Sequence, residues 1–553
     1  MTKIDSKEKQ KERKMDNIHN PIIPGFYPDP SICRVGDDYY IACSSFELYP
    51  GIPLFHSKDL AHWEQICNVM TIENGFHVEC SYGGGGVMAP TIRYNNGTYY
   101  IMNCNFSHRG NYIVTAKDPK GPWSHPHWLE DVPGIDASLF FDDDGTCYVV
   151  GTGDAWDEEL GMNTCGIWIA KFDIEHFKML GKPVTIFHSA MRGAEHPEAP
   201  HLYHIGEYYY LMIAEGGTDQ HHCVAVARSK ELFESFENNP DNPVMTHRMM
   251  GSYAAITNVG HADLVETQNG NWYAVMLASR NIDGKHKNLG RETYICPVVW
   301  EDGWPLFSPK TGHLEFEYEG SGLPDTRYEH QIKRYEFEEK EFEQEWTWWG
   351  TPYELFFERK DSKLNIKCVA QKLIEELKPA SFDFQSPRGR ENFAPFIALR
   401  ETEFNFSVAC CMRFKPITQE SAGLAIVQQM NNQYHFEWIQ EEGTEYLQLV
   451  RYFAEFDSRP YLPGFSSKTK CETIAKVPYD KEKVVLKLKG KGKDYTFYYG
   501  ESEAELKEFA KGDSTKISTE QIGCMTGTMI GMYATGNGKN VDNQATFEWF
   551  EMI

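Results

Sequence analysis

A short pattern occurs five times in the first half of this 553-residue sequence. Each copy has a glycine-containing turn, one or two aromatic residues and then an apolar run, and the turns contain Gly36, Gly97, Gly145, Gly206 and Gly270. Successive copies are 48 to 64 residues apart, which is enough for about four short antiparallel strands and their turns. Each copy is therefore expected to form one blade of a β-propeller, and five copies predict five blades.

A second pattern precedes each turn and ends in an aliphatic residue: DPSI, APTI, DASL, EAPHL and HADL. If these aliphatics begin the equivalent strand of every blade, residues three or four positions earlier occupy matching places around the propeller axis. Those residues are Asp29, Met88, Asp136, Glu198 and His261. A single Asp before a strand usually forms a turn. Three carboxylates that converge on one channel are costly unless function requires them, so this set predicts a catalytic centre.

Three neighbouring carboxyl groups suit the hydrolysis of a glycosidic bond. One carboxylic acid protonates the departing oxygen, and one carboxylate acts on the opposite side of the sugar. In the inverting reaction the carboxylate activates water, and the two groups stand roughly 6.5–9.5 Å apart to admit it. A third carboxylate nearby raises the pKa of the acid by like-charge repulsion. The three groups are therefore interpreted as base, acid and modulator.

The segments NPIIPGFYPDPSI, IDASLFFDDDGT, EAPHLY, GHADLVET and LGRETYI resemble the motif series of glycoside hydrolase family 43, above all its two-domain β-xylosidases. The resemblance extends over nearly the whole chain. It implies that Asp29 is the general base and Glu198 the general acid. It also implies that Asp136 orients the acid and modulates its pKa.

The same resemblance implies four substrate contacts. Phe46 in CSSFELYPG would pack against the sugar, and Arg291 in LGRET would reach the base and the sugar hydroxyls. The structural alternatives are a place in the hydrophobic core for Phe46 and a surface ion pair for Arg291. His261 would lie near the channel, beside the base-side water or a cation, or would be a structural histidine. Met88 stands in GGGGVMAP, where the family usually has tryptophan, and offers a less rigid wall.

A chain of this length is too long for one hydrophobic core. Beyond the propeller, alternating runs such as FNFSVACCMRF and GLAIVQQM fit a two-sheet β-sandwich, which resembles the lectin-like (concanavalin A-like) domain of family-43 xylosidases. The protein is therefore expected to be all-β. By the family pattern, one loop of this domain covers the propeller mouth and leaves a pocket that admits only chain ends. The predicted divisions are an N-terminal tail at 1–16, the propeller at 17–325, a linker at 326–345 and the sandwich at 346–553.

The net charge indicates which classes of partner the protein binds, and the cysteines indicate its cellular compartment. A formal net charge of −26 disfavours nucleic acid and anionic membrane surfaces, so a neutral oligosaccharide is expected. The first residues are charged, unlike a secretory signal. The fourteen cysteines form no CxxC pair, and Cys43, Cys147 and Cys410 lie in apolar runs, which is typical of buried thiols in the cytoplasm.

The His-rich segments lack the spacing of a zinc site, so no metal ligands are assigned and no cofactor is required. The resemblance leaves open a calcium or sodium ion in the channel. The sequence also leaves open whether the chain forms a homo-oligomer.

The leading interpretation is an exo-acting, inverting β-xylosidase on xylo-oligosaccharides. An α-L-arabinofuranosidase, or one pocket with both activities, is the nearest alternative, since the two sugars present similar hydroxyl patterns. A retaining glycosidase would need the base-side carboxylate near enough to attack carbon. A non-catalytic sugar-binding propeller is disfavoured because candidates for both acid and base are present.

Overall fold

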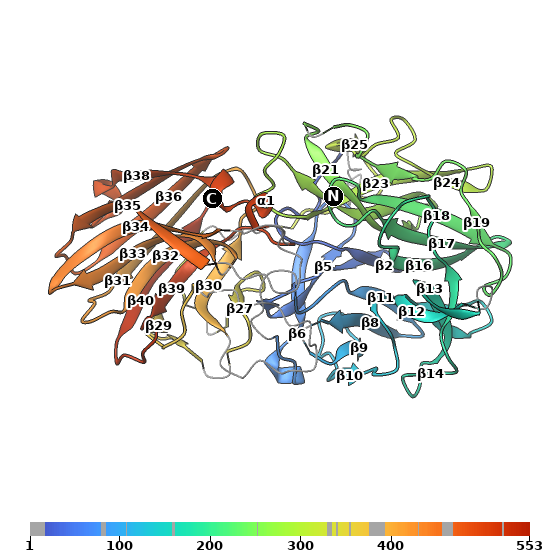
Figure 1. Cartoon of the computed structure of the whole chain (residues 1–553), viewed down its shortest axis with the longest axis horizontal. Coiled ribbons are helices and arrows are strands. Elements are labelled where there is room, and N and C mark those ends of the chain that lie inside the picture. The colour runs from blue at the N-terminus through green and yellow to red at the C-terminus, as the bar shows by residue number, and fades with distance from the viewer. Residues whose placement is uncertain are drawn as a thin grey trace, which may run out of the picture.

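The computed structural model describes the whole chain except residues 1–16, 79–84, 107, 158–160, 252, 329–333, 339–340, 353–354, 375–392, 430, 456–467 and 523–524. The predicted N-terminal tail therefore lies outside the described residues. Figure 1 shows two β-rich bodies side by side, the N-terminal one in blue to green and the C-terminal one in orange to red. This arrangement confirms the all-β prediction. Within the described ranges, no helix has the length and apolar character needed to cross a bilayer.

The first body is a five-bladed β-propeller, as the five repeats predict. Its blades are antiparallel sheets, apart from one parallel pairing in blade 3. Their innermost strands contact one another in a closed ring, in the order β2, β7, β11, β16, β21 and back to β2. Residues at matching positions along these five strands therefore lie around a common axis.

The strands of the blades are as follows. Blade 1 has β2 (Ser31–Val35), β3 (Asp38–Ala42), β5 (Gly51–Ser57) and β6 (Glu64–Met70), and blade 2 has β7 (Thr91–Asn95), β8 (Thr98–Asn105), β9 (Gly110–Ala116) and β10 (His127–Trp128). Blade 3 has β11 (Ile135–Phe141), β12 (Cys147–Asp157), β13 (Met162–Asp173), β14 (Lys178–Met179) and β15 (Val184–Phe187). Blade 4 has β16 (Glu198–Ile205), β17 (Tyr208–Glu215), β18 (Cys223–Ser229), β19 (Glu237–Asn238) and β20 (Met245–Thr246). Blade 5 has β21 (Ile256–Glu266), β22 (Trp272–Arg280), β23 (Glu292–Glu301) and β24 (Trp304–Phe307).

The repeated glycines lie at the turns between the first two strands of the blades. All five have φ between 64° and 84°, a left-handed conformation that is inexpensive only for glycine. No heavy atom of the described residues lies within 4 Å of where a Cβ would stand at any of them, so backbone conformation rather than crowding explains the glycines. The five glycines are Gly36, Gly97, Gly145, Gly206 and Gly270.

The second body is a sandwich of two eight-stranded sheets, which confirms the predicted C-terminal fold. One sheet contains β26 (Arg334–Tyr335), β28 (Phe357–Arg359), β29 (Leu364–Lys367), β31 (Asn405–Arg413), β36 (Val484–Lys491), β37 (Asp494–Gly500), β38 (Lys507–Asp513) and β40 (Gln544–Met552). The other contains β4 (Leu48–Tyr49), β27 (Thr347–Trp349), β30 (Ala394–Arg400), β32 (Ser421–Gln429), β33 (Asn432–Glu441), β34 (Thr444–Glu455), β35 (Lys468–Pro478) and β39 (Met529–Thr535).

Two pairings link segments far apart in the chain. Strand β4 lies within the sequence of blade 1 but pairs with β27, and so becomes an edge strand of the sandwich. Strand β1 (Asn17–His19) pairs with β25 (Glu317–Glu319), which brings the start and end of the propeller together. Apart from the propeller and the sandwich, the described chain has three short 3-10 turns and a single α-helix, α1: η1 (Ile72–Asn74), η2 (Glu503–Glu505), η3 (Ser514–Ile517) and α1 (Thr519–Ile522).

The sandwich is fixed to the segment that leads into blade 1. The Arg400 guanidinium lies 4.2 Å from the ring centroid of Tyr27, and its Nε donates to the carbonyl oxygen of Phe26 at 2.8 Å. One apolar cluster contains Phe26 from the propeller and Tyr533 from the sandwich. Because Asp29 follows Tyr27 by two residues, the second domain supports the backbone that carries it.

Candidate active site

The same backbone bend occurs in four blades, just before β2 in blade 1 and within β11, β16 and β21 in blades 3 to 5. Asp29, Asp136 and His261 have φ of 56°, 54° and 53°, and Ala199 takes the same bend in blade 4 with φ of 52°. Left-handed backbone is unfavourable for these residue types and is found most often where function holds it in place. Glu198 comes one residue before the bend, which explains why its spacing is four residues where those of Asp29, Asp136 and His261 are three.

Asp29 is buried and held at both carboxylate oxygens. Arg291 Nη1 donates to Oδ1 at 2.8 Å, and Ser44 Oγ donates to Oδ2 at 2.5 Å. His261 Nδ1 stands 3.9 Å from Oδ1. Arg291 is itself only 6% exposed, so the alternative of a surface ion pair does not describe it. The guanidinium therefore pairs with the predicted base inside the site.

Asp136 and Glu198 form the second part of the site. Burial raises the pKa of Asp136 well above its ordinary value, and the nearby charges of Glu198 and Asp29 raise it further. Burial also raises the pKa of Glu198, with Asp29 adding to the effect and His196 and Arg291 opposing it. Both directions favour a carboxyl pair that retains a proton, and the three carboxyl groups lie close enough to influence one another.

The two carboxyl groups of this pair are not equally accessible. Asp136 is 5% exposed and accepts a hydrogen bond from the Ala199 N–H at 3.1 Å, whereas Glu198 is only half-buried. Glu198 is therefore the better placed of the two to meet a ligand.

Phe46 and Met88 lie beside these groups, on the side of the sandwich. Phe46 is 1% exposed, and its ring stacks on Phe26 with 5.7 Å between centroids and lies 5.4 Å from the Arg291 guanidinium. Met88 is half-buried and packs against the same apolar cluster, as does Met525 of the sandwich. The predicted contact of either side chain with a sugar stays a prediction.

A segment of the sandwich meets the loop that carries Arg291. Asn288 Nδ2 donates to the Ser514 carbonyl oxygen at 2.6 Å, and the Thr528 N–H donates to the Asn288 carbonyl oxygen at 2.9 Å. A Cβ placed on Gly290 would stand 2.5 Å from the Thr526 carbonyl oxygen. Ser514, Thr526 and Thr528 are therefore the sandwich residues that meet the Arg291 loop, a contact that the sequence left unidentified.

A buried ion pair joins the inner strands of the propeller, between Arg93 of β7 and Asp263 of β21. Arg93 Nη1 donates to Asp263 Oδ2 at 2.9 Å, Ser31 Oγ donates to the same oxygen at 2.7 Å, and the Tyr203 hydroxyl donates to Oδ1 at 2.6 Å. Burial alone would raise the pKa of Asp263, but the Arg93 charge and these hydrogen bonds hold it well below its usual range. Four of the five blades are joined through this carboxylate.

Three further residues near the site were missed by sequence reasoning or had no role assigned. Ser44 contacts Asp29, and Thr218 Oγ1 accepts a hydrogen bond from Arg291 Nη1 at 2.8 Å. His222 Nδ1 faces the Asn258 carbonyl oxygen at 2.9 Å, and burial lowers its pKa to about 3, so it is neutral. The contacts of Thr218 and His222 join blades 4 and 5, whereas the contact of Ser44 joins two loops of blade 1, and no local sequence pattern marks any of them.

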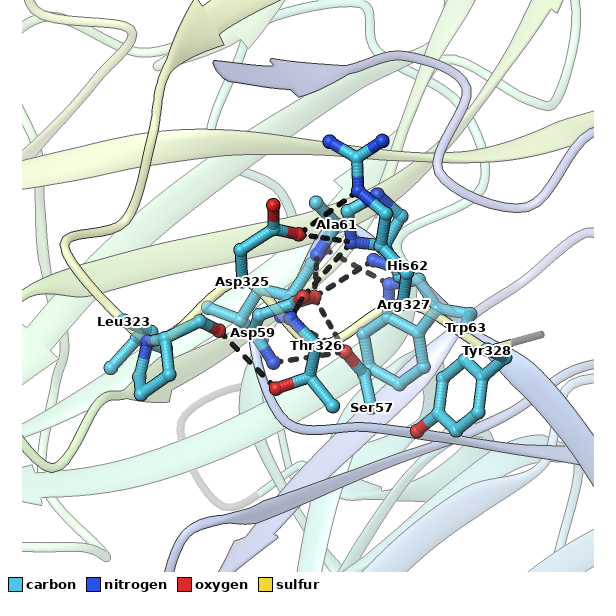
Figure 2. Close-up of polar contacts among 12 residues, drawn as sticks. Ser57, Asp59, Ala61, His62, Trp63, Leu323, Asp325, Thr326, Arg327 and Tyr328 are labelled. Carbon is cyan, nitrogen blue, oxygen red and sulfur yellow. Dashed lines mark hydrogen bonds and ion pairs between the residues drawn. The ribbon is translucent and has the colours of Figure 1, made fainter. Parts of the chain in front are cut away.

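A cluster with the composition of a metal site lies where blade 1 meets the end of the propeller (Figure 2). Asp59 Oδ1 accepts from the N–H groups of Ala61 and His62 and from Ser57 Oγ, at 2.8 to 3.2 Å. Asp59 Oδ2 accepts from the Thr326 N–H at 2.8 Å and faces His62 Nδ1 at 2.9 Å. A carboxylate has about four lone-pair sites, and these partners occupy them. The contacts of Asp59 therefore indicate that it joins two segments of the chain and does not bind a metal ion.

Comparisons with known proteins agree with this architecture. Residues 18–305 match the sequence profile of "Glycosyl hydrolases family 43", and residues 334–553 match that of "Beta xylosidase C-terminal Concanavalin A-like domain". A "Xylosidase/arabinosidase" of Butyrivibrio fibrisolvens is 39% identical, with 96% of this chain and 98% of the relative covered. A "Non-reducing end alpha-L-arabinofuranosidase" of Bacteroides ovatus is 34% identical, with 97% and 94% covered. The crystal structure of a xylan beta-1,4-xylosidase from Bacillus halodurans superposes with a TM-score of 0.83 at 29% identity, covering 97% of this chain and 99% of that one.

Proposed function

Because the chain belongs to glycosyl hydrolase family 43 and is a glycosidase, we propose that it is an inverting, exo-acting β-xylosidase that releases terminal xylose from xylo-oligosaccharides. The main observation that supports this proposal is that its three carboxyl groups have different surroundings. Asp29 is paired with a guanidinium, whereas the pKa of Glu198 and that of Asp136 are both raised. A base and a proton donor need such different surroundings.

In this mechanism Asp29 accepts a proton from water as the water oxygen bonds to the anomeric carbon. Glu198 gives its proton to the glycosidic oxygen as the bond from that oxygen to the anomeric carbon breaks. Asp136 is the proposed modulator: repulsion from Glu198 and Asp29 helps burial to raise the pKa of Asp136, so that the pair retains a proton for Glu198 to donate. Arg291 holds Asp29 in place, and its Nε and Nη2 atoms have no hydrogen-bond partner among the described residues, which suits a contact with sugar hydroxyls.

Exo action rests on the second domain. The sandwich packs against the Arg291 loop and contributes Met525 to the apolar cluster beside Phe46 and Met88. A mouth bordered on one side by another domain favours a pocket over an open cleft. Phe46, Met88, His261 and Arg291 are the proposed sugar contacts.

A second candidate is α-L-arabinofuranosidase activity, alone or in the same pocket. It is favoured by the names of two relatives, one a xylosidase/arabinosidase and one an arabinofuranosidase. Measuring kcat/KM on the aryl β-xyloside and the aryl α-L-arabinofuranoside separates these activities. A ratio near one would mean a bifunctional enzyme.

The test of the residue roles is to make Asp29→Asn and Glu198→Gln separately. Each should retain affinity for xylobiose and lose most of its turnover. Matched controls are Asp37→Asn and Glu207→Gln, because these exposed carboxylates lie at the far turns of the same blades. Near-normal turnover of xylobiose by either active-site variant would overturn the assignment.

We further propose that the enzyme needs no metal and works in the cytoplasm. Acid and base are both supplied by side chains, although a calcium or sodium ion in the channel would be compatible with this chemistry. Ten of the twelve cysteines in the described part of the chain are buried, and all twelve are free thiols, which suits a reducing compartment.

A further inference from the structure

Ser44 is a buried hydroxyl with an unusually direct connection to the predicted base. It follows β3 and is 0% exposed, and its Oγ lies 2.5 Å from Asp29 Oδ2. Its backbone N–H also donates to the Pro28 carbonyl oxygen at 3.0 Å. Ser44 therefore donates two hydrogen bonds to the turn that contains Asp29, one from its backbone and one from its side chain.

The two oxygens of Asp29 are held by residues from two different blades. Arg291 in blade 5 takes Oδ1, and Ser44 in blade 1 takes Oδ2. A carboxylate held at only one oxygen can swing about its last torsion, whose preference is broad. Held at both, it keeps one plane, so the lone pair that receives the proton of water points in a fixed direction.

We propose that Ser44 is a positioning residue for the catalytic base, an inference that rests on the proposed role of Asp29. Its single O–H is used by Asp29, so it has no proton to offer a sugar or the attacking water. Ser44 contributes by orienting Asp29, because proton transfer in the transition state depends steeply on alignment.

The chain offers a matched control at the next position. Ser45 is also 0% exposed, but its Oγ accepts a hydrogen bond from the Ile52 N–H at 3.2 Å. Ser44→Ala and Ser45→Ala remove the same atom from adjacent buried sites. Only the first removes a bond to Asp29.

The experiment compares both variants by steady-state kinetics and by urea unfolding. Ser44→Ala should lower kcat about ten- to hundredfold, the range expected for one hydrogen bond to a charged group, with KM within about twofold of wild type. The loss should be the same on xylobiose and on 4-nitrophenyl xyloside, since attack by water is needed for both. Ser45→Ala should lose similar stability and keep its kcat.

A double-mutant cycle with Asp29→Asn makes the test specific. If Ser44 acts through Asp29, Ser44→Ala should cost less than about twofold in the Asp29→Asn background. An equal loss in both backgrounds, or equal kcat values for the two serine variants, would overturn the inference. Failure of the proposed function looks different, because Asp29→Asn would then itself retain near-normal turnover.

Discussion

Replacing Gly290 with alanine should damage catalysis through the contact between the two domains. Gly290 has φ of 75°, which costs an alanine about 1–2 kcal/mol. The new Cβ would also stand 2.5 Å from the Thr526 carbonyl oxygen and 2.8 Å from a ring carbon of Phe26. Both distances lie well inside van der Waals contact, so the loop has to move. Because Arg291 is the next residue, its hold on Asp29 at 2.8 Å should be displaced, and a shift of about 1 Å costs on the order of a hundredfold in rate.

Gly270→Ala is the control for this prediction. Gly270 has φ of 81° and no heavy atom within 4 Å of its Cβ position, so the substitution carries the conformational cost alone. The assay is kcat on xylobiose beside the midpoint of urea unfolding. Gly270→Ala should lose stability and keep its kcat, whereas Gly290→Ala should lose both. If the two variants have equal kcat values, the sandwich does not set the position of Arg291.

Three further predictions concern proton donation, pH and metal. Glu198→Gln should lower turnover of xylobiose about 10²–10⁴-fold but that of 4-nitrophenyl xyloside far less, since a good leaving group needs little protonation; equal losses would argue against Glu198 as the acid. Burial raises the pKa of Glu401 to about 8, so between roughly pH 4.5 and 8 the folded state keeps a proton that the unfolded chain releases. Over this range the free energy of unfolding of the wild type, relative to that of Glu401→Gln, should fall by about 1.4 kcal/mol per pH unit. Thermal unfolding at several pH values measures this, and parallel curves would contradict it. Chelation with EDTA should leave kcat unchanged, and a loss restored by calcium would show that the channel needs an ion.

The sequence predicts the propeller well because its repeat is local. The first turn of every blade needs a left-handed backbone, which favours glycine, so the turns can be recognised in the sequence by residues such as Gly36 and Gly97. The bends at Asp29 and Asp136 recur for the same reason, and the strands that follow form a closed ring. A pattern repeated at matching positions thus predicts which side chains converge.

The remaining features depend on contacts between distant segments. The pairing of β4 with β27 cannot be read from the sequence, because Leu48 and Tyr49 look like any short apolar step in a propeller loop. In the described chain, blades 3 and 4 each have a fifth strand, β15 and β20, which pairs with the third strand of its blade and has no counterpart in the other three blades. Ser44 is one of two adjacent serines, and only the fold distinguishes the one that reaches Asp29.

The most direct test of the account is the configuration of the first sugar released from a β-xyloside, followed by proton NMR before mutarotation. Attack by water activated at Asp29, on the face opposite Glu198, predicts that α-xylose appears first and the β-anomer grows later. Initial release of β-xylose would mean that a carboxylate attacks the anomeric carbon, and would contradict the roles assigned to both residues.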